Sequence, residues 1–263
     1  MKINFSKYEG AGNDFVLLNG KTTQTLESSI IKKICNRHFG IGADGLIVIK
    51  ENTNADFEMV YYNADGNLGS MCGNGSRCAA VFSLEQQIIK SNRTKFRASD
   101  GMHSAEIFPG NEVKISMTDV NSWRFSENDF ITNTGSPHYV KYVSGLEKMN
   151  IVEEAKKIRY NNEFSTTGGI NVNFVEEADK QLYMRTYERG VEDETLACGT
   201  GTVAVAISSR FLMGKPIEGN FEVSIKAIGG DLKVMGEYVD GLFKNLYLIG
   251  PVKKVFEGSF EID

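Results

Sequence analysis

Two cysteines in this chain stand in front of nearly the same glycine turn. Residues 71–80 read MCGNGSRCAA and residues 197–206 read ACGTGTVAVA, so Cys72 and Cys198 each precede a Gly-x-Gly turn that runs into an apolar segment. The two copies are separated by about half of the 263 residues. This spacing indicates a duplicated unit that carries one cysteine per copy.

A glycine turn that leads into a helix suits both cysteines for proton transfer. The first N–H groups of a helix are unpaired and lie at the positive end of its dipole, so they bind an anion. The same position lowers the pKa of a thiol from about 8.5 to roughly 3.5–7.5. If both thiols converged on one ligand from opposite sides, one could remove a proton from a carbon while the other returned a proton. The amides would hold a carboxylate and stabilise the developing negative charge.

Other motifs predict no competing chemistry. Cys35 and Cys78 lie within apparent helices without a glycine turn, and we interpret them as small buried side chains. The segment from Asn63 onward resembles the start of a calcium loop, but Leu68 occupies the position that needs glycine. A cysteine hydrolase needs a positioned histidine, and of His38, His103 and His138 only His138 lies in a turn-rich polar segment, so one histidine would have to account for two cysteines. Cys72 and Cys78 are too far apart for a C-x2-C pair, and no pair of histidines lies nearby at zinc-finger spacing, so we expect no metal site.

Composition and charge restrict the partners. The net charge of −5 and the pI of about 5.4 argue against binding to nucleic acid or to a membrane surface, and favour a small-molecule partner. No apolar run approaches the roughly 20 residues of a membrane span, and the first residues lack the pattern of a signal peptide. We expect a cytoplasmic protein with reduced thiols.

Most of the ordered segments read as strands. Alternating runs rich in β-branched and aromatic residues predict strands at 2–9, 57–62, 103–108, 112–117, 170–175, 181–187, 221–227, 230–238 and 246–256. Three-and-four spacing of apolar residues predicts amphipathic helices at 26–39 and 151–160. The segments after the cysteines, 75–84 and 201–213, are apolar nearly all round, which is typical of enclosed helices.

These elements predict an α+β fold of two similar, pseudo-symmetric units. Each unit would be a curved, mostly antiparallel sheet wrapped around a central helix, with the active site in the cleft between the units. We expect residues 1–118 to carry the first cysteine and residues 119–263 the second. Whether the last strand, 252–262, returns to the first half is left open.

The chain also resembles a known family. The motifs KYEGAGNDFVLLNG, YYNADGNLGSMCGNGSRCAA, GSPHYV, GINVNF and YERGVEDETLACGTGTVAVA resemble those of the diaminopimelate epimerases, in the same order and over essentially the whole chain. Related racemases of the same fold share the two cysteine motifs, whereas GAGNDF and YERG point to this family. The resemblance implies an isomerase of lysine biosynthesis that interconverts LL- and meso-diaminopimelate without pyridoxal phosphate or any other cofactor. We expect the chain to form a homodimer.

Site residues follow from the same resemblance. It implies that Cys72 and Cys198 are the catalytic acid and base, and that Arg189 binds the distal carboxylate of the substrate. Glu188 would bind the ammonium at the reacting carbon, and His138 would help to orient the site. The remaining implied substrate contacts are Asn13, Asn63, Gly73, Asn74, Asn171, Gly199 and Thr200.

Two features depart from the common family pattern. Ser136 stands where many members have asparagine, and the loop from Val191 to Ala197 is one residue longer than the commonest form. Both departures bear on the substrate contacts and not on Cys198 itself.

Two alternative functions stay open. A proline or hydroxyproline racemase of the same two-cysteine class would not need Arg189 and several asparagines for a second amino-acid end. A carboxylate-binding protein without chemistry would keep its function when both cysteines are replaced by alanine.

Overall fold

The computed structural model describes residues 2–21, 26–212, 214 and 216–261. The chain divides into two compact units, Met1–Ile115 with Gly250–Asp263, and Ser116–Ile249. Cys72 lies in the first unit and Cys198 in the second. No helix in the described part of the chain has the length and apolar character needed to cross a lipid bilayer.

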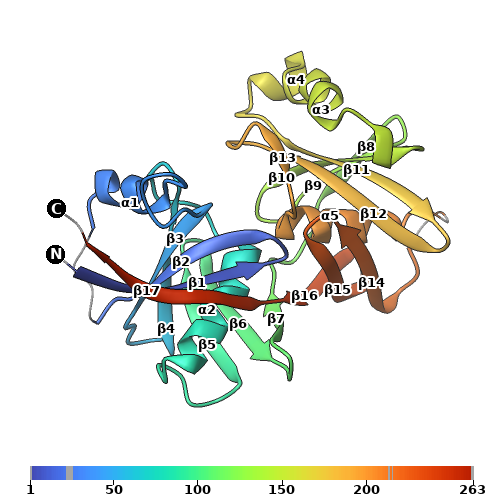
Figure 1. The fold of residues 1–263 in the computed structure, drawn as a ribbon. Helices are drawn as coiled ribbons and strands as arrows, with labels where there is room; N and C mark the ends of the chain where they lie inside the picture. Colours follow the sequence, from blue (N-terminus) through green and yellow to red (C-terminus); the bar gives the residue numbers. More distant parts are fainter. Residues whose placement is uncertain (1, 22–25, 213, 215, 262–263) are drawn as a thin grey trace. The chain divides into compact units, whose positions relative to one another are not determined.

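In the first unit, a sheet surrounds the second of two helices (Figure 1). Its elements are β1 (Lys2–Gly10), β2 (Asn13–Asn19), α1 (Ser28–Cys35), β3 (Gly45–Lys50), β4 (Phe57–Asn63), α2 (Gly73–Glu85), β5 (Arg93–Ala98), β6 (Gly101–Ile107), β7 (Glu112–Ser116) and β17 (Lys253–Glu261). Strand pairing runs from β1 to β7 in chain order, with β2–β3 and β4–β5 parallel and the others antiparallel. Helix α2 contacts β1, β2, β3, β4 and β6, so the sheet curves around it.

The second unit repeats this plan. Its elements are β8 (Trp123–Ser126), β9 (Asp129–Asn133), β10 (Pro137–Tyr142), the 3-10 helix η1 (Leu146–Lys148), α3 (Ile151–Arg159), α4 (Asn162–Ser165), β11 (Asn171–Ala178), β12 (Gln181–Glu188), β13 (Asp193–Thr195), α5 (Gly199–Ser209), β14 (Gly219–Ala227), β15 (Gly230–Val239) and β16 (Leu242–Pro251). The pairs β10–β11 and β12–β14 are parallel, and antiparallel pairs flank them as in the first unit. Helix α5 contacts strands β9, β10, β11, β14 and β15. The predicted α+β fold of two similar units is confirmed.

The last strand pairs with the first. In β17 and β1, Glu261 lies opposite Lys2 and Lys253 opposite Glu9, in antiparallel register (Figure 1). This pairing assigns the C-terminal segment to the first unit, a question that the sequence left open. The run predicted as one strand at 246–256 is two strands, since β16 ends at Pro251 and β17 begins at Lys253. Proline has no N–H for the ladder, so it suits a strand end.

The enclosed helices lie where their apolar sequences predict. Helix α2 buries every residue from Gly73 to Ser83, and α5 buries nearly all of its residues. The amphipathic helix α1 is shorter than the predicted 26–39, because Asn36 adopts an extended backbone and ends it. Helix α5 ends at Ser209, and Met213, the predicted end, lies outside the described residues.

Candidate active site

Cys72 caps the N-terminus of the enclosed helix α2. Its backbone is extended, with φ −114° and ψ 116°, and its Sγ accepts the N–H of Gly75 at 3.5 Å. A Cβ at Gly75 would lie 2.9 Å from Cδ1 of Ile47, so glycine lets the helix approach β3. Gly73 and Asn74 form the first turn beside the thiol. Their position follows from the glycine turn that the sequence shows.

Cys198 occupies the same place on α5. It stands at the N-cap position with φ −119° and ψ 114°, within a few degrees of the values at Cys72, although its side chain makes no capping hydrogen bond of the kind that Cys72 makes with Gly75. A Cβ at Gly201 would lie 2.4 Å from Oδ1 of Asn173 and 3.3 Å from Cβ of Cys198. Glycine at this position therefore makes room for the groups packed against the cysteine. The two cysteines hold equivalent positions in the two units.

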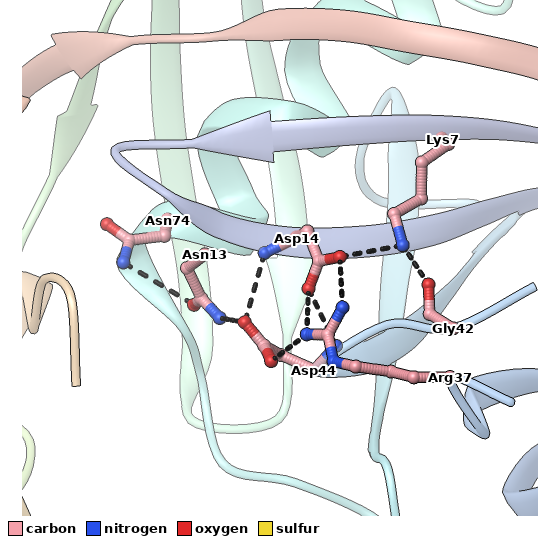
Figure 2. Close-up of polar contacts among 7 residues, drawn as sticks. All are labelled: Lys7, Asn13, Asp14, Arg37, Gly42, Asp44 and Asn74. Atoms are coloured by element: carbon pink, nitrogen blue, oxygen red, sulfur yellow. Dashed lines mark hydrogen bonds and ion pairs between the residues drawn. The ribbon is translucent and has the colours of Figure 1, made fainter. Parts of the chain in front are cut away.

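A charged network holds the side chain of Asn13 in place (Figure 2). Asn13 Nδ2 donates to Oδ2 of Asp44 at 2.6 Å, and its Oδ1 lies 3.7 Å from Cys72 Sγ. Arg37 pairs with Asp44 at 2.7 Å and makes two hydrogen bonds to Asp14. Asp44 also accepts the N–H of Asp14, at 3.1 Å. These charges keep the carboxylate of Asp44 in place, so the amide nitrogen of Asn13 is directed away from the thiol.

Lys7 completes the network from β1. Its Nζ pairs with Asp14 at 2.7 Å and also donates to the carbonyl of Gly42, and its side chain is almost fully buried (Figure 2). Burial alone would raise the pKa of Asp14, but the hydrogen bonds and charges of Arg37 and Lys7 outweigh it and hold that pKa well below its usual range. Asp14 is therefore an anion that anchors two cations beside the first cysteine.

Arg77 fixes the other amide near Cys72. This guanidinium is fully buried on α2, and its Nη2 donates to Oδ1 of Asn74 at 3.0 Å. The nitrogen of that amide then faces Asn13, with Asn74 Nδ2 3.4 Å from Asn13 Oδ1. The guanidinium of Arg77 at one end and the carboxylate of Asp44 at the other thus set the orientation of the amides of Asn74 and Asn13.

In the second unit, a buried histidine lies beside Cys198. His138 is fully buried on β10, and its Nε2 is 2.8 Å from Oγ1 of Thr200. Thr200 Oγ1 is in turn 3.6 Å from Cys198 Sγ. Burial, with a smaller contribution from the charge of Arg189, lowers the pKa of His138 to about 3. The imidazole is therefore neutral near neutral pH.

Asn171 connects Ser136 to the segment that carries Arg189. Its Nδ2 donates to Oγ of Ser136 at 2.9 Å and to the carbonyl of Pro137 at 3.0 Å, and its Oδ1 accepts the N–H of Arg189 at 2.8 Å. The side chain of Ser136, shorter than the asparagine common at this position in the family, thus accepts a hydrogen bond from the amide of Asn171. Arg189 is exposed, and Glu188, half-buried, precedes it at the end of β12. In the first unit, Asn63 is exposed at the end of β4.

The sequence interpretation missed the residues that hold these side chains. Lys7, Asp14, Arg37 and Asp44 come from different segments, and no local pattern links them. Asn173 had a detectable signal, because it follows Asn171 by two positions on β11 and so lies on the same face of the strand.

Glu192 was missed as well. Its carboxylate pairs with Arg159 at 2.9 Å and accepts from Tyr160 OH at 2.7 Å, Tyr187 OH at 3.0 Å and the N–H of Gly190 at 3.1 Å. Although burial alone would raise the pKa of Glu192, these donors lower it to about 2. The residue therefore anchors the loop that follows Arg189.

Similarity to solved structures defines the class of fold. A phenazine biosynthesis protein of the PhzF family from Bacillus anthracis aligns over 100% of both chains with a TM-score of 0.79 and 14% identity. A hydroxyproline epimerase from Agrobacterium vitis aligns over 100% of this chain and 93% of its own, with a TM-score of 0.70 and 13% identity. The chain thus has the two-unit fold that these proteins share.

Sequence similarity then identifies the family. The family model for diaminopimelate epimerase matches residues 5–123 and 130–255. A diaminopimelate epimerase from Flavobacterium psychrophilum is 42% identical over 95% of this chain and 97% of its own length. One from Chlorobaculum tepidum is 39% identical over 96% and 99%. The chain belongs to the diaminopimelate epimerase family, so the resemblance seen in its motifs and its assignment to the isomerases are confirmed.

Proposed function

We propose that this chain interconverts LL- and meso-diaminopimelate by removing and returning one Cα proton, with Cys72 and Cys198 as the paired acid and base. The observation that carries the proposal is the equivalent placement of the two thiols, one in each unit, at the N-cap of an enclosed helix with nearly the same backbone angles. Like groups in like positions suit a reaction that runs both ways, because acid and base exchange roles with direction.

The helix termini supply the electrostatics of this reaction. The first N–H groups of α2 belong to Gly73 and Asn74 and those of α5 to Gly199 and Thr200, directly after each cysteine, at a helix end of the kind that binds anions. They would bind the α-carboxylate and stabilise the negative charge that develops as the Cα–H bond breaks. The step needs only the thiolate, the thiol and these amides, so we propose that it proceeds without a cofactor.

The side chains that recognise the substrate follow from family membership. We assign the distal carboxylate to Arg189, whose planar fork suits a bidentate contact, and the ammonium at the reacting carbon to Glu188. Glu188 is the last residue of β12 and Arg189 comes directly after it. The side chain of Arg189 is exposed and so accessible to a ligand. Asn13, Asn63 and Asn171 would supply hydrogen bonds to the rest of the substrate. We place the enzyme in the cytoplasm, where its thiols stay reduced.

A proton NMR time course tests the substrate assignment. LL-diaminopimelate is incubated with the reduced protein in heavy water, and a chiral separation follows the products. We expect one α-proton signal to disappear while the meso isomer grows. If proline or hydroxyproline exchanges its α-proton and diaminopimelate does not, Arg189 does not bind a distal carboxylate as assigned. That result would still support proton transfer by the two cysteines.

A further inference from the structure

The contacts of Asn173 determine which way its amide points. Its Nδ2 lies 3.0 Å from the carbonyl of Tyr139, which can only accept a hydrogen bond. Its Oδ1 accepts the hydroxyl of Thr186 at 3.0 Å. Asn173 and Thr186 are both buried, so water does not compete for these bonds. The amide therefore presents its nitrogen, a donor, to its third neighbour.

That third neighbour is the imidazole of His138. Asn173 Nδ2 lies 3.2 Å from Nδ1 of His138. Because the amide donates, Nδ1 must accept and carries no proton. A neutral imidazole has one protonated nitrogen, so the proton resides on Nε2. The low pKa of His138 is consistent with this neutral form.

The protonated Nε2 then determines the direction of the Thr200 hydroxyl. Nε2 donates to Thr200 Oγ1 across 2.8 Å, so the hydroxyl accepts on that side. Its own proton is left for another acceptor, and Cys198 Sγ lies 3.6 Å away. Either atom of this contact can donate when the sulfur is a thiol, but only the hydroxyl can donate when the sulfur is a thiolate. A hydrogen bond to the sulfur stabilises the thiolate relative to the thiol. Gly201 keeps this arrangement open, since a Cβ there would reach Asn173 Oδ1 and lie 3.3 Å from Cε1 of His138.

We propose that Asn173 is a positioning residue: it selects the Nε2–H tautomer of His138, which makes the Thr200 hydroxyl a donor to Cys198 and so stabilises the thiolate of that cysteine. The proposal rests on the proposed function in assigning catalysis to Cys198. Arg189 is the charged group that acts on His138, and its positive charge also favours a neutral imidazole.

The corresponding contact of Cys72 has the opposite polarity. Cys72 Sγ lies 3.7 Å from Asn13 Oδ1, and the contact is a thiol donating to an amide oxygen. The bond from the N–H of Gly75 and the nearby charge of Arg77 favour the thiolate there, so the surroundings of Cys72 are mixed. A side-chain donor directed at the sulfur distinguishes Cys198.

Nitrogen NMR of histidine-labelled protein tests the tautomer directly. The chain has three histidines, His38, His103 and His138, and a His138→Gln variant assigns the signal of interest. We expect a protonated Nε2 and an unprotonated Nδ1 at neutral pH. In Asn173→Asp, whose carboxylate accepts from the ring, we expect Nδ1 to gain a proton. A protonated Nδ1 in the unsubstituted protein would overturn the proposal.

Alkylation of the thiols tests the last bond. Iodoacetamide labelling is followed against pH, and mass spectrometry quantifies the peptides containing Cys198 and Cys72 separately. Thr200→Val removes one hydrogen bond to the thiolate, so the pH at which the labelling rate of Cys198 is half-maximal should rise by about one unit. At pH values below that midpoint, Cys198 should be labelled about tenfold more slowly than in the unsubstituted protein. Thr200→Ser should restore it, while Cys72 serves as the internal control. An unchanged Cys198 midpoint in Thr200→Val contradicts the proposal, and neither readout depends on epimerase activity.

Discussion

Replacing Asp44 by asparagine should weaken catalysis through Asn13 without removing any proposed substrate contact. Asp44 accepts from Asn13 Nδ2 at 2.6 Å and pairs with Arg37 at 2.7 Å. In Asp44→Asn a neutral amide replaces the carboxylate, so no charge holds the nitrogen of Asn13 away from Cys72. Asn13 can then rotate and present a donor where the thiol now meets an acceptor.

The size of this effect follows from the contact that is lost. A hydrogen bond to a charged group contributes about 1.5–3 kcal/mol. Because the side chain of Asp44 is 41% exposed, solvent screens the charge and the lower end applies. A loss of about 1.5 kcal/mol corresponds to roughly a tenfold lower kcat/KM. The bond acts on the orientation of Asn13, so we expect the loss for the LL and the meso substrate alike.

The matched control is Glu106→Gln. Glu106 lies on β6 of the same unit and pairs with Arg93 at 2.8 Å and with Lys114 at 2.9 Å. The Glu106→Gln substitution therefore removes a carboxylate with ion pairs comparable to those of Asp44. Its kcat/KM should stay within twofold of the unsubstituted enzyme. Initial rates in both directions, measured by chiral separation, check both variants. Unchanged rates in Asp44→Asn, or equal losses in the two variants, would refute the positioning of Asn13 by Asp44.

Further predictions concern stability and the loop after Arg189. Asp14 has a depressed pKa in the fold, so its ion pairs stabilise the protein above its ordinary pKa of about 3.9 and are lost as pH falls toward the lower folded value. Urea unfolding should therefore show Asp14→Asn to be less stable than the unsubstituted protein at pH 7 and closer to it at pH 3; a constant difference would contradict this. Gly201→Ala places a Cβ against Asn173 and should cost about 1–3 kcal/mol of unfolding free energy, and a stability equal to that of the unsubstituted protein would show that the close approach is wrong. Glu192→Gln loosens the loop and should raise KM for diaminopimelate more than it lowers kcat, whereas an unchanged KM would separate Glu192 from Arg189.

Local sequence signals predicted the parts of the fold that depend on local chemistry. The glycine turns at Cys72 and Cys198 predicted two helix N-termini, and the all-round apolar segments after them predicted enclosed helices. These features could be predicted because the residues that cause each of them lie within one short segment of the sequence.

Features that depend on distant partners were not predictable in this way. Strand β3 reads LIVI without alternation because both of its faces are buried, so a period-two pattern could not reveal it. The network of Lys7, Asp14 and Arg37 joins segments whose approach is set by the parallel β2–β3 pair and the turns around it. The pairing of β17 with β1 closes a loop of nearly the whole chain, and hydrophobic pattern alone does not select such a partner.

The central claim is that the two cysteines act as one acid–base pair. The most direct test measures how fast the single variants Cys72→Ala and Cys198→Ala, kept reduced, epimerise LL- and meso-diaminopimelate. Each single variant should lose epimerisation in both directions, because every turnover needs one thiolate to remove the proton and one thiol to return it. Near-normal turnover by either variant would contradict the account.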